Sequence, residues 1–251
     1  MSVSINYMGR LGNNIFQYVA AYIFAKKFNL QIITEPIHTP FDLPKLLGNT
    51  YSSDSKFEVN DSNFLELLNS ESVEPNHYVF NGFFQIKDFV LNYKSQIKSL
   101  FKLSYDETNN DEVFVMYRIG DIEGIRQMLP IEFYEEALNK IPYKKGYITS
   151  DTPNHPNVIK LSKEFNLTIY NNTASETINF AKNFKNLVLS EGSFSWWIGL
   201  LSNSENIYYN KRERFWFGDI FVFPEWKPLY FDWDPECVSS NNKLICNKII
   251  K

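Results

Sequence analysis

The chain has 251 residues, which is enough for one large domain or two small ones. Hydrophobic residues make up 44% of it, including 22 Phe, 15 Tyr and 5 Trp, so a substantial core is expected and disorder is not. The net charge is -4 and no basic stripe is present, which argues against general binding of nucleic acid. A small anionic ligand remains compatible with this charge, because it needs only a few placed positive groups.

The sequence carries no recognisable signal for export or membrane insertion. Residues 1–6 lack a charged region followed by an apolar one, and no stretch approaches the roughly 20 apolar residues of a membrane span. We expect a cytoplasmic protein of bacterial or viral type, with peripheral membrane association left open; the alternative is that an anchor was removed. Cys237 and Cys246 are expected as free thiols, although a disulfide between them is conceivable. No Cys/His set has zinc spacing.

The first part of the chain reads as an α/β unit that starts with strand, glycine turn, helix and strand. Apolar residues recur at helical spacing directly after the glycine turn. The elements expected here are a strand at 3–7, a helix at 15–28, a strand at 30–34, a short helix at 62–68 within the irregular stretch 36–78, a strand at 78–85 and a helix at 87–101.

A polar, acidic segment at 104–112 is the best linker candidate, so we expect domains at 1–108 and 109–251. Strands and helices alternate after it. The strands are expected at 113–117, 147–150, 167–170, 186–190 and 207–209, the last of the chain, and the helices at 131–141, 158–165, 175–182 and 194–201. This alternation predicts an α/β fold of two Rossmann-like domains facing across a cleft, with ligands at the carboxyl ends of parallel strands.

The first motif, Gly9-Arg-Leu-Gly-Asn-Asn14, lies between an expected strand and an expected helix. Gly12 allows a ligand to approach the backbone, the helix start favours an anion, and Arg10 offers a fork of donors suited to phosphate. An ordinary strand-to-helix turn is an equal alternative. The motif is neither a dinucleotide fingerprint nor a P-loop.

Two further motifs follow expected strands. Arg118 and Asp121 come directly after the apolar run 113–117, where Arg118 could neutralise a departing diphosphate and Asp121 could accept a proton. A salt bridge between them is an equal alternative. Ser193 and Ser195 open the expected helix at 194–201, where they could cap it or bind phosphate oxygens. This run does not match the nucleophile elbow of hydrolases.

Together these motifs resemble the α1,2-fucosyltransferases of glycosyltransferase family 11, and more widely the α1,6- and protein O-fucosyltransferases. The matching stretches are GRLGNNIFQY at 9–18, GFFQ at 82–85, MYRIGD at 116–121, PIEFY at 130–134, Ser150-Asp151 at a strand end and SFSWW at 193–197. Their order and spacing agree over nearly the whole chain. Met116 and Ile119 depart from the family pattern, which has His and Arg there, and Asn14 replaces Gln.

The resemblance implies the arrangement called GT-B, with an acceptor-side domain at 1–108 and a nucleotide-sugar domain at 109–251. It implies transfer of L-fucose from GDP-fucose to a glycan hydroxyl with inversion, in α1,2-linkage, without a metal or other cofactor. By analogy, Arg10 and Asn13 would hold the diphosphate, Arg118 would neutralise the leaving phosphate, and Ser193, Phe194 and Ser195 would surround the nucleotide. We also expect Gly12 and Asp151 in donor binding, and Arg118, Asp121 and Glu123 as the catalytic residues. Asp121 is expected as the base, with Glu123 behind it.

Other features favour structural interpretations. Asp232-Trp-Asp234 has a metal-binding pattern, but it stands near the C-terminus with no sheet behind it. His38, His77 and His155 are expected at the surface, and the aromatic residues at 215–226 in the core. The alternative functions are transfer of a different nucleotide sugar, non-catalytic binding of a nucleotide or sugar, and hydrolysis by Ser195, for which no convincing His–acid pair is found.

Overall fold

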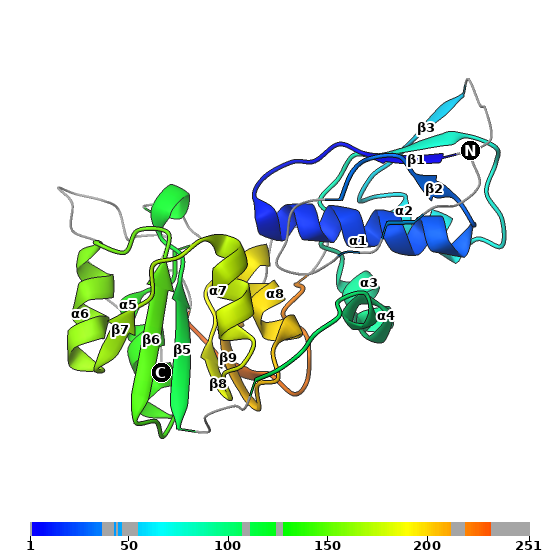
Figure 1. The fold of residues 1–251 in the computed structure, drawn as a ribbon. Helices are drawn as coiled ribbons and strands as arrows, with labels where there is room; N and C mark the ends of the chain where they lie inside the picture. Colours follow the sequence, from blue (N-terminus) through cyan, green and yellow to red (C-terminus); the bar gives the residue numbers. More distant parts are fainter. Residues whose placement is uncertain are drawn as a thin grey trace. The chain divides into compact units, whose positions relative to one another are not determined.

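The structure is a computed structural model that describes residues 2–36, 43, 45–46, 55–106, 111–123, 128–211 and 219–231 (Figure 1). The chain divides into two compact units. Unit 1 is Met1–Ser104 with Glu213–Val222, and unit 2 is Tyr105–Arg212 with Phe223–Lys251. The domain boundary expected after residue 108 falls within 107–110, outside the described residues, and stays a prediction.

Unit 1 contains a parallel sheet of four strands in the order β2-β1-β4-β3. The strands are β1 Ser2–Ile5, β2 Gln31–Ile32, β3 Lys56–Val59 and β4 His77–Phe80. The central strands β1 and β4 alternate buried and partly exposed residues, and in β1 the sequence Ser-Val-Ser-Ile alternates in the same way. Strand β3 was not expected from the sequence, because only Val59 of its four residues is buried and the apolar pattern is correspondingly weak.

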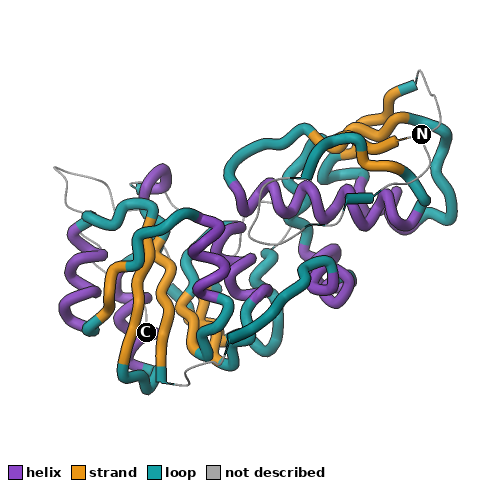
Figure 2. Tube along the Cα trace, viewed as in Figure 1, coloured by secondary structure: helices purple, strands orange, loops and turns teal. Residues whose placement is uncertain are grey.

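The helices of unit 1 are α1 Leu11–Lys27, α2 Phe64–Asn69, α3 Lys87–Asn92 and α4 Lys94–Ser99 (Figure 2). Helix α1 begins four residues before the expected start, so the second half of the first glycine motif forms its first turn. The single helix expected at 87–101 is wrong, because Tyr93 leaves helical geometry and separates α3 from α4. None of the helices in the described ranges is both long and apolar enough to cross a membrane.

Unit 2 contains a parallel sheet of six strands in the order β10-β9-β8-β5-β6-β7. The strands are β5 Glu112–Tyr117, β6 Lys145–Ser150, β7 Leu167–Ile169, β8 Asn186–Val188, β9 Asn206–Asn210 and β10 Lys227–Leu229. Counted from β5, this is the strand order of the Rossmann fold. The expectation that 207–209 forms the last strand is wrong, because β10 pairs with β9 beyond it.

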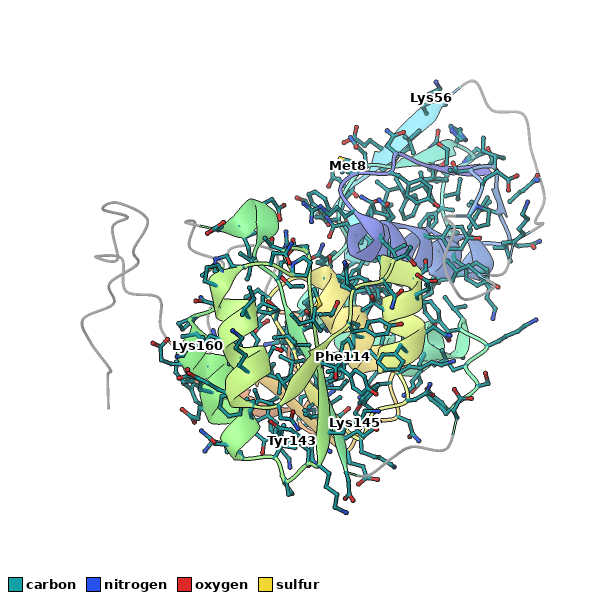
Figure 3. The ribbon with its side chains drawn as sticks, turned by 60° about the vertical axis from the view of Figure 1, so that its left-hand side comes forward. Met8, Lys56, Phe114, Tyr143, Lys145 and Lys160 are labelled. Carbon is teal, nitrogen blue, oxygen red and sulfur yellow. The ribbon has the colours of Figure 1, made fainter. Side chains whose placement is uncertain are left out.

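Helices cover both faces of this sheet, as Figure 1 shows. They are α5 Ile131–Asn139, α6 Pro156–Glu164, α7 Ala174–Ala181 and α8 Ser193–Leu201, and a short 3-10 turn, η1 Gly120–Ile122, follows β5. Val113, Val115 and Tyr117 of β5 join the core cluster that includes residues of α5 and α6. Phe114, between them in sequence and labelled in Figure 3, contacts Phe180 of α7 instead. Strand β5 is therefore buried on both faces, as its continuous apolar sequence predicts.

A buried amide fixes the loops at the carboxyl edge of the unit 1 sheet. Gln17 of α1 is fully buried, and its Oε1 accepts hydrogen bonds from Met8 N (3.1 Å) and Asn14 Nδ2 (3.2 Å). Its Nε2 donates to the carbonyl oxygens of Met8 (3.3 Å) and Gly82 (3.0 Å). One side chain thus joins the loop after β1 to the loop after β4.

Replacing Gln17 with Leu should lower the free energy of unfolding of unit 1 by about 2 kcal/mol or more, because backbone polar groups would lose their buried partner. Urea unfolding followed by hydrogen exchange of unit 1 amides measures the loss. Gln96→Leu, on the exposed side of α4, is the matched control and should change stability little. Equal stability of the two variants would contradict the role assigned to Gln17.

Candidate active site

The strand order of unit 2 creates one point where neighbouring loops diverge. After β5 the chain continues to β6 on one side of the sheet, whereas after β8 it continues to β9 on the other. In open parallel sheets, ligands bind outside the carboxyl ends of the strands at such a switch point. Arg118 and Asp121 follow β5, and Ser193 begins α8 after the loop that ends β8, so the structure brings together three of the residues expected to act on a donor.

Arg118 is held from its backbone and from its side chain. Its N–H donates to Ser190 Oγ at 3.0 Å, which ties the end of β5 to the end of β8. Its Nη2 lies 3.2 and 3.3 Å from the two carboxylate oxygens of Asp121. The Nε atom is buried and has no hydrogen-bond partner among the described residues. A charged donor is therefore fixed at the switch point with part of its hydrogen-bonding capacity unused.

Gly192 lets this guanidinium reach the start of α8. The residue has a φ of +98°, which favours glycine, and a Cβ atom there would lie 2.5 Å from Arg118 Nη1. Among the described residues no side chain caps α8, and the first turn of this helix contains no acidic residue. The helix start and Arg118 thus present positive charge together, a combination suited to an anion such as phosphate.

The first turn of α8 supplies hydroxyl groups beside this charge. Ser193 and Ser195 are buried, and Ser195 Oγ has no hydrogen-bond partner within the described part of the chain. Phe194 between them is only partly buried. The three residues expected to surround a nucleotide therefore combine two small buried hydroxyls with one partly exposed aromatic ring.

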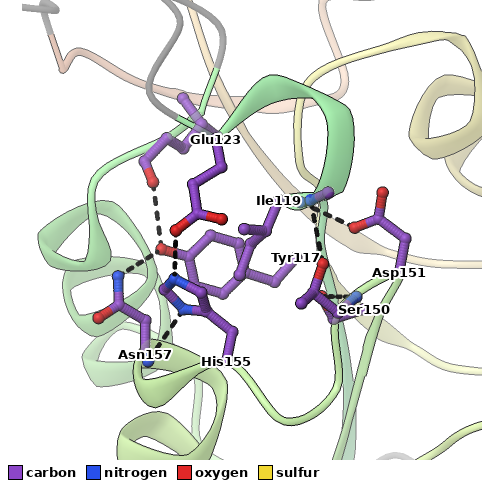
Figure 4. A network of polar contacts seen from close by, with 10 residues as sticks. Tyr117, Ile119, Glu123, Ser150, Asp151, His155 and Asn157 are labelled. Atoms are coloured by element: carbon purple, nitrogen blue, oxygen red, sulfur yellow. Dashed lines mark hydrogen bonds and ion pairs between the residues drawn. The ribbon is translucent and has the colours of Figure 1, made fainter. Parts of the chain in front are cut away.

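The loop after β6 holds the loop after β5 in place (Figure 4). Asp151 Oδ1 accepts the N–H of Ile119 at 2.9 Å, and Thr152 Oγ1 accepts the N–H of Gly120 at 3.1 Å. Gly120 is needed for this approach, because a Cβ there would clash with the Asp151 carboxylate. Asp151, expected at the donor, thus acts on the backbone that carries Arg118; its direct contact with a donor stays a prediction.

Glu123 has a different partner from Asp121. Its Oε1 lies 3.2 Å from Nε2 of His155, whose Nδ1 accepts the N–H of Asn157 at 3.1 Å and so caps α6 (Figure 4). Because Nδ1 is an acceptor, the neutral ring carries its proton on Nε2 and donates it to Glu123. The side chain of His155 is 15% exposed, so this residue, expected at the surface, lies partly buried at the start of α6.

Tyr117 anchors the same network from the core. Its hydroxyl donates to the carbonyl oxygen of Leu129 at 3.3 Å and accepts a hydrogen bond from Asn157 Nδ2 at 3.2 Å. Burial raises the pKa of Tyr117 to about 12, so the phenol remains protonated at neutral pH. The Tyr134 ring packs on Tyr117 with centroids 4.1 Å apart. The start of α6 and the end of β5 are thus joined through a buried phenol.

Two of the departures from the family pattern, Met116 and Ile119, are buried in unit 2. Ile119 is fully buried and belongs to the core cluster of unit 2. Met116 is 6% exposed and pairs in register with Thr149 of β6. Both apolar side chains are thus packed in the described structure of unit 2, and Ile119 contributes to its stability.

The first glycine motif lies in unit 1. Arg10 is exposed and stands directly before α1, whereas Gly12 is buried within the helix. Asn13 Oδ1 accepts a hydrogen bond from Gln85 Nε2 at 3.0 Å, and its side chain packs against Gly9, which has a φ of +76°. The structure therefore links the first motif to the GFFQ turn at 82–85. The assignment of Arg10, Gly12 and Asn13 to donor binding stays a prediction.

Sequence reasoning missed the residues that position the site. Ser190, His155 and Asn157 hold the loop of Arg118, and Asp61 accepts the N–H groups of Phe83 and Phe84 in the GFFQ turn. These partners are 22 or more residues apart in the chain, so no local pattern could pair them. Ser190 alone had a signal, its place at an expected strand end.

Several features singled out in the sequence lie outside the described residues. They are His38, Asp232-Trp-Asp234, Cys237, Cys246 and the aromatic residues at 215–217. Of the other aromatic residues in that stretch, Phe221, Phe223 and Trp226 are buried, as expected. Within the described ranges, no group of three or more His, Cys, Asp or Glu is placed to hold a metal ion.

Replacing Gly192 with Ala should weaken binding of inorganic pyrophosphate by about tenfold or more, because the new methyl group would displace Arg118 from the start of α8. Calorimetric titration measures the change. Gly146→Ala is the control, since its Cβ would press on Leu167 at the amino end of β6. Gly146→Ala should reduce the stability of the protein without changing its affinity for pyrophosphate. Equal affinity of the wild type and Gly192→Ala for pyrophosphate would refute the proposed placement of the anion.

Comparison with known proteins agrees with this geometry. The family model described as glycosyl transferase family 11 matches residues 75–215, which is more than half of the chain and includes β5, α8 and the loops of Arg118 and Gly192. Searches of curated proteins and of solved structures returned no match. This match over more than half of the sequence leads to one conclusion: the chain belongs to glycosyl transferase family 11.

Proposed function

We propose that the protein transfers L-fucose from GDP-fucose to a hydroxyl group of a glycan acceptor, with inversion and in α1,2-linkage. Membership of glycosyl transferase family 11 supports transfer from a nucleotide sugar to a glycan. The observation that carries the proposal is the placement of Arg118 against Gly192 at the start of α8, where a diphosphate would meet a guanidinium and the amides of a helix start.

The reaction in this proposal is a single displacement. An acceptor hydroxyl attacks the anomeric carbon of the donor while the bond from that carbon to the diphosphate breaks. Arg118 and the start of α8 stabilise the charge that grows on the leaving diphosphate. Asp121 accepts the proton of the hydroxyl, with Glu123 as the second candidate. Ser193, Phe194 and Ser195 contact the nucleotide, and no metal ion is required.

The further assignments remain part of the proposal. Arg10 and Asn13 assist in holding the diphosphate, Gly12 allows its approach to α1, and the two units adopt the GT-B arrangement. The enzyme works in the cytoplasm on a glycan acceptor. Met116 and Ile119 support the main alternative, transfer of a different sugar from the same or another nucleotide, because they replace polar family residues beside Arg118.

Calorimetric titration of the purified protein with GDP, UDP, CMP and GDP-fucose, with and without a chelator, tests the donor. We expect binding of GDP and GDP-fucose alone, unaffected by the chelator. The apparent stability of the protein should rise with the concentration of the bound ligand. Transfer is then measured with a panel of oligosaccharide acceptors. Binding of UDP only would move the proposal to another donor, and binding of GDP without any transfer would favour a non-catalytic protein.

Replacing Arg118 with Ala should lower the rate of GDP release from GDP-fucose by about 10²- to 10³-fold, the usual effect of losing one preorganised charge partner. Lys144→Ala is the matched control. Lys144 pairs with Asp111 in the loop before β6, so the substitution also removes a cation that faces an Asp, but at the opposite edge of the sheet. It should leave the rate unchanged. A wild-type rate for Arg118→Ala would remove Arg118 from the mechanism.

A further inference from the structure

The contact between Arg118 and Asp121 has the geometry of a weak ion pair. Both carboxylate oxygens approach the same nitrogen, Nη2, at 3.2 and 3.3 Å. Charge-assisted N–H···O bonds are typically about 2.8 Å long, and strong Arg–carboxylate pairs use two N–H groups in parallel. The Asp121 side chain is also 49% exposed, and exposed ion pairs contribute little to stability. This contact can therefore be replaced at low cost.

The unused part of the guanidinium lies next to this contact. Arg118 Nε is buried and has no hydrogen-bond partner in the described residues. In a planar guanidinium, Nε–H and one Nη2–H form a single edge that two oxygens of an anion can meet together. Asp121 contacts Nη2 and leaves Nε unmet. An incoming phosphate that met Nε and Nη2 together would compete with Asp121 for Nη2.

We propose that the donor diphosphate displaces Asp121 from Arg118, and that this exchange prepares Asp121 to act as the base. The inference rests on the proposed function above. While Arg118 contacts Asp121, both carboxylate oxygens face Nη2 of the guanidinium. Once the diphosphate has taken Arg118, these oxygens are available to an acceptor hydroxyl. Donor binding thus both fills the anion site and makes a proton acceptor available.

The chemical step then balances. The acceptor oxygen forms a bond to the anomeric carbon and transfers its proton to an Asp121 oxygen. The bond from the anomeric carbon to the diphosphate oxygen breaks, and the electron pair leaves with the diphosphate, whose charge faces Arg118. Because the diphosphate takes the place of Asp121 at Arg118, the proton acceptor and the leaving group come into position in the same donor complex.

Asp121→Asn tests the exchange, because it keeps the shape of the side chain and removes its charge. We expect GDP to bind about two- to five-fold more tightly, since the anion no longer competes with a carboxylate for Arg118. We expect the rate of GDP release from GDP-fucose to fall by about 10²-fold or more, since the base is lost. Calorimetry at fixed ionic strength and a release assay measure the two quantities.

Asp111→Asn is the matched control. Asp111 pairs with Lys144 at the opposite edge of the same sheet, so its substitution removes the same charge from unit 2 without touching Arg118. It should change neither quantity. Asp121→Ser repeats the test should Asp121→Asn show altered circular dichroism.

The outcomes separate the inference from the proposed function. Unchanged or weaker GDP binding by both Asp121 variants, while Arg118→Ala weakens it, overturns the exchange and leaves the proposed function standing. Tighter binding with an unchanged rate also overturns it, because Asp121 would then compete for Arg118 without serving as the base. Failure of the wild-type protein to bind GDP contradicts both the exchange and the proposed function. Tighter binding of GDP together with slower release of GDP from GDP-fucose supports the exchange, since damage to the fold would weaken the binding as well as slow the release.

Discussion

The parallel pairing of β5 with β6 on one side and β8 on the other is the constraint on which the site of unit 2 depends. It places the loops that follow three separate strands at one edge of the sheet. Arg118 receives a backbone contact from the loop after β8, through Ser190, while the loop after β6 holds the neighbouring Ile119 through Asp151. A displacement of either neighbour would move the guanidinium relative to the start of α8.

Two different kinds of interaction meet at this edge. The core below it is apolar and aromatic, with β5 buried on both faces. The layer above it consists of short polar contacts made by carboxylates, hydroxyls and an imidazole to backbone N–H groups. The first layer fixes where the strands end, and the second fixes the direction of the chain after each strand. Precise placement of a charged side chain needs both.

The sequence predicted the parts of the fold that have local signals. The apolar run 113–117 and the alternation after it are typical of a parallel sheet, and the strands and helices of unit 2 lie close to the expected ranges, apart from β10. Strand β3 was missed because its residues are mostly exposed, and the break at Tyr93 because the apolar spacing continues across it. The Rossmann strand order could not be predicted from the sequence, because the pairing between β5 and β8 joins residues more than 70 positions apart.

The site, too, has residues with a local sequence signal and residues without one. Arg118 and Asp121 were visible because they follow an apolar strand, whereas His155 gave no signal of its contacts with Glu123 and Asn157. This imidazole uses one nitrogen as the acceptor that begins α6. The other nitrogen of the ring contacts Glu123, so one side chain joins the loop after β5 to the first turn of α6. Removal of the ring would therefore take away the cap at Asn157, and with it the support of the amide that contacts the hydroxyl of Tyr117 at the end of β5.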